Sequence, residues 1–382
     1  ATSLDVRTLD PGYDANQFEV AWADDPFVTN PYFAVNKAKN EDERRRFIGS
    51  FSTRYNIADY LYARARVGID YFNINGWNIS PTGQQFNNFG NYSTSRNNGY
   101  ETNLEGLLGF DKIFGKFSVN ALVGGNQMYT QNRSGGLSSG NLNVPFNYFI
   151  SNGASQGFTD NFGESAINSL FSSVDVGFNS YLYLSISARQ DWFSTLSPES
   201  NSVLYPSVGL SFVFTDAWDA KPSWLDYGKI RSSWAQVGGG MPGPYGLDLL
   251  YSAGSISHLG QPLMTITGST IPNPLKPFTS TTTEAGIEFR ALNNRIGADL
   301  TFYDKTTTND IVSASIPTTS GYSAVSLNVG EMRNRGVELL LTGAPVRSSA
   351  GLNWDSSFNM AYNENEVVKI APGLTSLTGG QP

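Results

Sequence analysis

One segment of the sequence has the spacing of a serine nucleophile. Gly153-Ala154-Ser155-Gln156-Gly157 fits the G-x-S-x-G pattern, in which a strained turn between a strand and a helix exposes the serine oxygen. Such a serine also requires a histidine that a carboxylate orients. The chain has a single histidine, His258, and no helical pattern follows the serine. We therefore interpret the segment as a Gly/Ser loop, and we expect no enzymatic activity and no catalytic residue.

Metal ligands and acid–base pairs are equally sparse. His258 has no neighbouring ligand at zinc spacing, and Asp24-Asp25 lacks the spaced oxygens of a calcium loop, so we expect no metal site and no cofactor. A pair of carboxylates could cleave glycosides. The carboxylates on the polar faces of the predicted strands are instead expected to wet an interior and to pair with Arg64, Arg66 or Arg290. They are Glu101, Glu105, Asp175, Glu284 and Glu288.

Aromatic side chains are the remaining candidates for ligand contact. The chain has 19 Tyr, 24 Phe and 7 Trp, and aromatic rings present broad apolar faces on which sugar rings or peptide side chains can pack. The substrate-contact candidates are those in or beside the long predicted loops, namely Trp77, Tyr129, Trp192, Tyr245, Tyr251 and Tyr322. The alternative for each is a place in the aromatic girdle of a membrane barrel, or packing within a loop.

The elements that position these residues are predicted to be long strands. Leu61, Ala63, Ala65, Val67, Ile69 and Tyr71 alternate with Tyr62, Arg64, Arg66, Gly68 and Asp70. A period of two over ten or more residues indicates a strand with one apolar and one wet face, of the length that crosses a bilayer core at a tilt. The pattern recurs along almost the whole chain and gives about 12 long strands. The fold class is therefore an all-β, transmembrane, antiparallel up-and-down β-barrel.

The predicted connections alternate between short and long, as in bacterial barrels, where short turns are periplasmic and long loops extracellular. Short connections lie near residues 57–59, 112–115, 179, 292–294 and 345–350, and long ones cover about 131–164, 238–280 and 309–331. The intermediate link 215–226 is expected to form a short helical turn capped by Asp216. This topology places Asp59, Lys112 and Asn293 inside the cell envelope, and Trp77, Tyr148, Tyr245 and Tyr322 outside.

Composition excludes several other classes of protein. The net charge of −8 and the pI near 4.8 leave no basic surface that could follow phosphates, so we expect no nucleic-acid partner. The absence of cysteine excludes a disulfide scaffold. Hydrophobic residues, at 40%, are spread as alternation and do not form the apolar runs of a soluble α/β core. One extended sheet system fits this composition best.

Several motifs resemble a known family of transporters. The most specific is Asn328-Val329-Gly330-Glu331-Met332-Arg333-Asn334-Arg335-Gly336-Val337-Glu338-Leu339, followed by Trp354-Asp355-Ser356-Ser357-Phe358-Asn359 and Asn363-Glu364-Asn365-Glu366. Asn30-Pro31-Tyr32 and Tyr205-Pro206-Ser207-Val208-Gly209 also fit. The chain resembles the SusC/RagA-like TonB-dependent outer-membrane transporters over nearly its whole length.

The resemblance implies a fold and a function. The fold is a barrel of about 22 strands with an N-terminal plug, and the function is import that is energised through TonB and uses a SusD-like surface lipoprotein as a lid. We expect residues 1–382 to be the central β-barrel portion, with the plug domain and the C-terminal strands not present. The implied location is the bacterial cell outer membrane, with lipid on the outer face. The implied substrate is a glycan or a peptide, and TonB contact is made through a segment outside this sequence.

Two other function classes compete with import. A passive porin, or a structural barrel component of a larger envelope complex, shows the same alternation of side chains. A soluble β-sandwich adhesin needs shorter strands with polar outer faces. An adjacent gene for a SusD-like lipoprotein distinguishes import from both.

Overall fold

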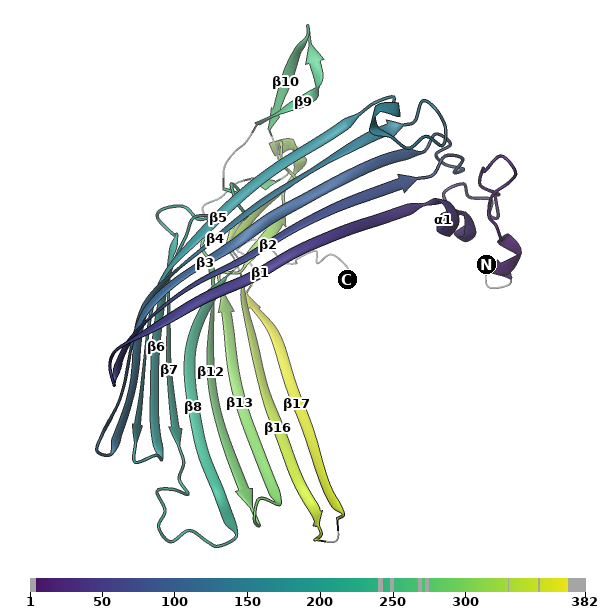
Figure 1. Cartoon of the computed structure of the whole chain (residues 1–382). Coiled ribbons are helices and arrows are strands. Elements are labelled where there is room, and N and C mark those ends of the chain that lie inside the picture. The colour runs from purple at the N-terminus through teal and green to yellow at the C-terminus, as the bar shows by residue number, and fades with distance from the viewer. Residues whose placement is uncertain are drawn as a thin grey trace. The chain divides into compact units, whose positions relative to one another are not determined.

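The computed structural model describes residues 5–239, 243–247, 251–266, 270–271, 275–328, 330–349 and 351–369 (Figure 1). Twelve of its strands form one sheet in the order β1-β2-β3-β4-β5-β6-β7-β8-β12-β13-β16-β17. Their bounds are Lys39–Ala58, Leu61–Ser80, Asn91–Phe114, Phe117–Asn141, Gly157–Phe178, Leu182–Phe193, Ser202–Phe212, Leu225–Gly239, Phe278–Ala291, Ile296–Thr308, Glu331–Arg347 and Asn353–Lys369. The prediction of about 12 long strands in an antiparallel sheet is confirmed.

The remaining elements are short. A hairpin pairs β9 (Tyr251–His258) with β10 (Gln261–Ile266), and a three-stranded sheet contains β11 (Thr270–Ile271), β14 (Ile311–Ser315) and β15 (Ala324–Asn328). The helices are α1 (Pro31–Lys37) and three single 3₁₀ turns, η1 (Val6–Leu9), η2 (Ile150–Asn152) and η3 (Thr318–Ser320). In the described residues, no helix has the length and apolar character that crossing a membrane requires.

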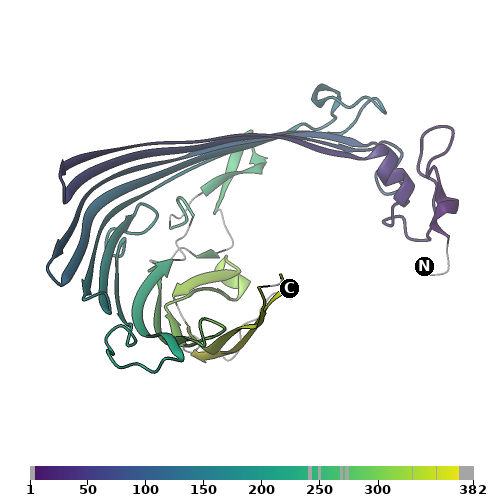
Figure 2. The ribbon, with the colours of Figure 1, turned by 60° about the horizontal axis from the view of Figure 1, so that its bottom comes forward.

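The chain divides into two compact units that share its first strands. The first unit contains Ala1–Phe51, Val67–Asn103 and Tyr129–Glu164, and the second contains Ser52–Arg66, Leu104–Met128 and Ser165–Pro382. Each of β2 to β5 therefore contributes its end near a long connection to the first unit and its end near a short turn to the second, and β1 contributes its end near α1 to the first unit. In Figure 2, the strands of the second unit, coloured from teal to yellow, follow one another around a curve.

The N-terminal segment is anchored within the first unit by a helix cap. Asn30 is fully buried, and its side-chain oxygen accepts hydrogen bonds from the backbone N–H groups of Tyr32 and Phe33 at the start of α1. Pro31 stands at the first helical position, where a missing N–H costs nothing. Glu19 accepts from the backbone N–H of Asn30 at 2.5 Å and from that of Gln85 at 2.9 Å, so one carboxylate ties this segment to the β2–β3 connection.

Several predicted strand ends and one predicted turn are wrong. Residues 131–141 and 157–164 belong to β4 and β5, so the loop predicted over residues 131–164 is confined to 142–156. Pro345 lies inside β16 and not in a turn. The link before β8 contains isolated turns in place of the helical turn predicted after Asp216, whose N–H bonds only to the carbonyl of Val213. The ends of β4 and β5 were missed because residues 131–141 and 157–164 are largely polar on both faces and give no alternation to read.

The other predicted short turns, and the long connections predicted over 238–280 and 309–331, lie within a few residues of those in the structure. β12 and β13 are joined by residues 292–295, in which Asn293 and Asn294 have φ of 57°, a left-handed conformation that asparagine tolerates. The connection after β8 contains the β9–β10 hairpin, and the connection after β13 contains β14 and β15. Long connections thus hold small structures of their own.

Candidate functional site

The second unit presents one apolar and one polar face across β6, β7, β8, β12 and β13. Directly paired residues of antiparallel strands project to the same side. The polar face contains the row Tyr183–Ser211–Arg231–Gly286–Thr301, and the apolar face contains the row Leu182–Phe212–Ile230–Ile287–Leu300. The predicted alternation is confirmed on all five strands.

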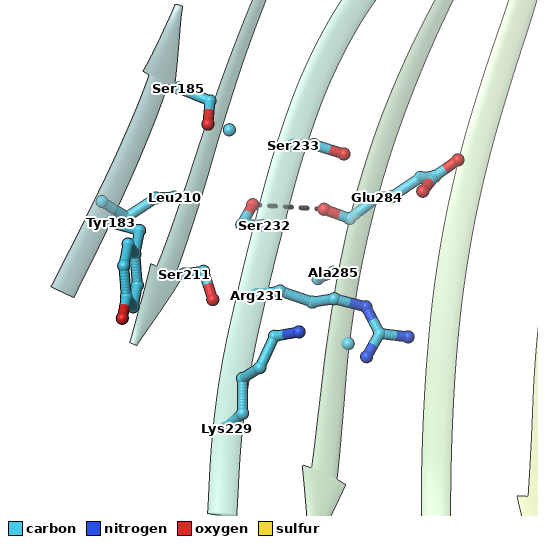
Figure 3. Close-up of a pocket in the computed structure, with 12 residues that line it drawn as sticks. Tyr183, Ser185, Leu210, Ser211, Lys229, Arg231, Ser232, Ser233, Glu284 and Ala285 are labelled. Carbon is cyan, nitrogen blue, oxygen red and sulfur yellow. Dashed lines mark hydrogen bonds between the residues drawn. The ribbon is translucent and has the colours of Figure 1, made fainter. Parts of the chain in front are cut away.

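Arg231 is the centre of a charged network on the polar face. Its Nη1 and Nη2 atoms donate to the two carboxylate oxygens of Asp299 at 3.1 and 2.7 Å, and Nη2 also donates to the Thr301 hydroxyl at 2.6 Å. Gly286 lies between these strands, on β12. Because this glycine has no side chain, the guanidinium crosses β12 and links β8 to β13 (Figure 3). The bidentate geometry fixes the position of the guanidinium.

A hollow of about 220 Å³ lies beside this network, across β6, β7, β8 and β12 (Figure 3). Lys229 and Glu284 contribute charged groups to its lining, in addition to Arg231. Its hydroxyl groups on the polar face come from Tyr183, Ser185, Ser211 and Ser233. The hollow exists because the strands here carry small residues, with glycine at positions 209 and 286. Such a lining can hydrogen-bond a polar ligand but contains no nucleophile–base pair.

Other carboxylates on the polar face are paired as predicted or bonded to neutral groups. Glu105 bonds to Arg64 at 2.9 Å, and Glu288 to Arg290 at 2.8 Å. Asp175 accepts from the Ser185 hydroxyl at 2.5 Å, and Glu101 from the Asn103 amide at 2.9 Å. Of the three arginines named as alternative partners, Arg64 and Arg290 pair with these carboxylates, and Arg66 makes no ion pair within the described residues. The arrangement is a wetted surface, and the carboxylates do not converge on one point.

Toward the long connections, the apolar face ends at a boundary. The position of this boundary shifts along the strand direction from one strand to the next. The apolar runs meet their first amide or charged side chain at Asp304 on β13, Gln236 on β8, Gln190 on β6 and Asn168 on β5. Asp304 lies in the same row as Val174, whereas Gln190 lies in the row of Leu170. On β5 the boundary is at Asn168, six residues from Val174, which marks the row of Asp304. From β13 to β5, which lie five strands apart in the sheet, the boundary therefore moves by six residues along the strand direction. At about 3.4 Å per residue and 4.8 Å per step, this shift corresponds to a strand tilt of about 40°.

Asp304, Gln236 and Asn168 at this boundary are hydrogen-bonded to side chains of the neighbouring strands. Asp304 accepts from the Nε atoms of Arg333 at 3.0 Å and Arg335 at 3.2 Å. Asn168 accepts from the Gln127 amide at 2.9 Å.

Comparison with known proteins identifies the family to which this sheet architecture belongs. The family model described as "TonB dependent receptor-like, beta-barrel" matches residues 2–382. The chain belongs to this family. The predicted resemblance is thereby confirmed, because the relatives include the TonB-dependent receptor SusC of Bacteroides thetaiotaomicron, which is 32% identical over 95 residues, 25% of this chain and 9% of that protein.

Longer matches within the family cover most of this chain but only part of each relative. TonB-dependent receptor P3 of Formosa agariphila is 23% identical over 388 residues, which are 98% of this chain and 37% of that protein. A solved structure of the RagAB peptide transporter aligns with a TM-score of 0.82 at 24% identity, over 91% of this chain and 39% of that one. The chain therefore spans well under half the length of these relatives.

The six aromatic residues predicted from the sequence to contact substrate are dispersed in this TonB-dependent receptor barrel. Trp77, Tyr129 and Trp192 lie within β2, β4 and β6, Tyr251 begins β9, Tyr245 lies in the turn at residues 244–247, and Tyr322 precedes β15. No ring contact joins any two of the six in the described part of the chain. Trp192 pairs with Asn168, so it stands in the boundary row, where a girdle residue is expected.

Tyr129 is the predicted residue with the most developed surroundings. Its hydroxyl donates to Glu164 at 2.6 Å, and its ring lies 5.9 Å from that of Tyr100, centroid to centroid. All three residues of this group lie in the first unit. The hydrogen bond to the Glu164 carboxylate raises the pKa of Tyr129 to about 12, so this hydroxyl remains a donor at any physiological pH.

The segments examined for catalysis and metal binding lie outside the charged network. Gly153 to Gln156 connect η2 to β5, so a strand and not a helix follows Ser155. His258 ends β9 and is exposed. No group of three or more histidine, aspartate or glutamate residues able to hold a metal ion occurs in the described ranges.

Sequence reasoning missed the residues at the centre of the network, Lys229, Arg231 and Asp299. The alternation in the sequence predicts that these residues lie on the polar faces of strands. It does not predict the contact between Arg231 and Asp299, because the two are separated by 68 residues and are brought together by the pairing of β12 with both β8 and β13. Alternation carries no information about register between distant strands.

Proposed function

We propose that this chain forms part of the barrel wall of a SusC-like TonB-dependent transporter that imports an oligosaccharide or an oligopeptide across the bacterial outer membrane. The observation that supports the proposal is the shift of the apolar–polar boundary from β13 to β5, which corresponds to tilted strands. A tilt of about 40° lies within the range for strands of outer-membrane barrels. The role is transport and not catalysis.

The exposure of the apolar face supports a lipid-facing orientation. Ile230 is 49% exposed and Phe302 is 51% exposed, and both lie on the apolar face of the sheet. Water is an unfavourable neighbour for such a continuous face, whereas lipid chains are not. The opposite face carries Lys229, Arg231 and Asp299, which would be costly in hydrocarbon, so it faces the lumen.

The proposed topology puts the first unit on the cell surface. β4 has 25 residues, whereas about 10 are sufficient to cross the membrane at a tilt. The surplus lies on the side of the long connections, which are extracellular in bacterial barrels. Exposed aromatic side chains gather in that unit, including Phe27, which is 75% exposed and stacks on Phe86, and Phe158, which is 83% exposed. Exposed apolar surface of this kind suits a protein partner, and we propose a SusD-like lipoprotein in that role.

Energy dependence tests the proposal. The full-length protein that contains this chain is expressed in its own cells, and uptake of labelled oligosaccharides and oligopeptides is measured with and without TonB. Active import predicts that uptake stops without TonB and that the lipoprotein copurifies with the protein. A passive porin or a structural barrel component predicts uptake that does not change, or no uptake.

A further inference from the structure

We propose that the hollow beside Arg231 binds a carboxylate group of the transported molecule, and that Lys229 is the residue that binds it. The inference rests on the proposed import function. It assigns a ligand chemistry to one place on the lumenal wall. The source of the carboxylate is either a peptide C-terminus or a uronic acid in an oligosaccharide.

Lys229 is the cation of this hollow that has no carboxylate of its own. No carboxylate in the described part of the chain lies within ion-pair distance of its ammonium. The guanidinium of Arg231 is hydrogen-bonded to Asp299 and Thr301, so its charge is already paired and is less available to a ligand. Glu288 stands opposite Lys229 in the register, but it bonds to Arg290 at 2.8 Å. The positive charge of Lys229 is therefore left to a ligand.

The surroundings of Lys229 suit a carboxylate better than a neutral group. Figure 3 shows Lys229 on the strand next to Ser211, below Arg231. A lysine ammonium offers three donors on a flexible stem. Ser211, which pairs with Arg231 two residues from Lys229, adds a neutral hydroxyl donor at this end of the hollow, whereas Ser185 and Ser233 line the other end, in the row of Glu284. A volume of about 220 Å³ is smaller than a typical ligand pocket, so it receives one group of a larger molecule.

Glu284 sets the orientation of the bound group. It pairs with Ser233, while Lys229 pairs with Glu288, four residues further along β12. At about 3.4 Å per residue, the two charges are anchored about 14 Å apart along the sheet. A carboxylate is repelled from the Glu284 end and attracted to the Lys229 end. The hollow therefore has a polarity along the strand axis.

Binding to the purified full-length protein in detergent tests the inference. The probes are tetra-alanine with a free and with an amidated C-terminus, and tetragalacturonic acid with its fully methyl-esterified form. The variants are Lys229→Met, Lys229→Arg and the control Lys305→Met. Lys305 lies on the same polar face of β13, outside the lining of the hollow.

The expected result is a loss specific to charge. Lys229→Met weakens binding of a free-acid probe by about 10-fold to 100-fold, the range for a hydrogen bond to a charged group, and leaves the amidated or esterified form unchanged. Lys229→Arg retains most of the affinity, and Lys305→Met retains all of it. Whichever free acid shows the loss identifies the source of the carboxylate.

Two outcomes overturn the inference. One is that the wild-type protein binds neither free acid more tightly than its neutral form. The other is that Lys229→Met weakens the acid and neutral probes equally. If TonB-dependent uptake persists in either case, the proposed function stands and only the pocket assignment fails. If binding depends on Lys229 but uptake does not depend on TonB, the pocket stands and the import proposal fails.

Discussion

The guanidinium of Arg231 lies directly over Gly286. A Cβ atom at Gly286 would be 2.9 Å from both Cζ and Nε of Arg231, which is closer than real Cβ contacts. Arg231 on β8 and Asp299 on β13 are separated by β12, and they can bond to each other because Gly286 of β12 has no side chain between them. A single position on β12 therefore controls the charge network of the polar face.

We predict that Gly286→Ala destabilises the full-length protein. The methyl group displaces the guanidinium and leaves Asp299 without its bidentate partner. Both side chains of the pair are about one-third exposed, so solvent screening limits the loss in the free energy of unfolding to about 1 kcal/mol. Urea unfolding of the protein in lipid vesicles measures the difference.

The matched control for this substitution is Gly106→Ala in β3. A Cβ atom there meets nothing within 4 Å, so the substitution should be neutral or slightly stabilising, as alanine is less costly than glycine in a strand. Equal destabilisation by both substitutions would mean that the Arg231 contact is not the cause.

We further predict which face of β2 contacts lipid. Leu61, Ala63, Val67 and Ile69 should face lipid, and Arg64, Arg66 and Asp70 the lumen. The Arg64–Glu105 and Arg46–Asp70 pairs are consistent with this orientation, because they place the charges of β2 together on one face. Single cysteines at positions 67 and 64 are labelled with a lipid-dissolved maleimide. Labelling at 67 alone is expected, and labelling at 64 alone would reverse the orientation.

The sequence predicted the faces of strands well but their ends poorly. Alternation is local, so Leu182 to Ala188 indicate both a strand and its apolar side without reference to any other strand. Residues 131–141 continue β4 although they are polar on both faces. Arg133 there bonds to Asp160 of β5 at 2.8 Å, so contacts between strands replace the apolar face as the reason for pairing.

The candidate site was predictable only in part. Pairing of the polar-face carboxylates with Arg64, Arg66 or Arg290 was predicted from the alternation, and Glu105 does bond to Arg64, but the alternation did not say which carboxylate pairs with which arginine. The Arg231–Asp299 pair escaped because the chain between β8 and β12 contains a hairpin, and its length gives no register. The hollow depends on that register too, since it forms only where Gly209 and Gly286 fall near each other.

The exposure of the connections on the proposed outer surface is a third prediction. Proteinase K added to intact cells should cut the full-length protein within residues 243–266, because the proposed topology places this connection outside. The connection at residues 142–156 should be cut more slowly, since the Asn152 side chain bonds to both Val144 and Asn147 and holds the loop closed. Fragments are identified by mass spectrometry. Cleavage of both segments only after the outer membrane is permeabilised would invert the topology.

The last prediction concerns membrane depth, and it tests the tilt itself. Spin labels at Asn168, Gln236 and Asp304 should lie at the same depth, at the level where apolar side chains give way to polar ones. A label at Val174 should lie deeper by about 15 Å, because six residues of a strand tilted by about 40° separate it from Asn168. Val174 is nevertheless in the same sheet row as Asp304. Relative accessibility to oxygen and to a water-soluble nickel complex measures each depth in vesicles. Equal depths at Val174 and Asp304 would mean that the strands run parallel to the membrane normal, and the apolar face would then lose its interpretation as a tilted barrel wall.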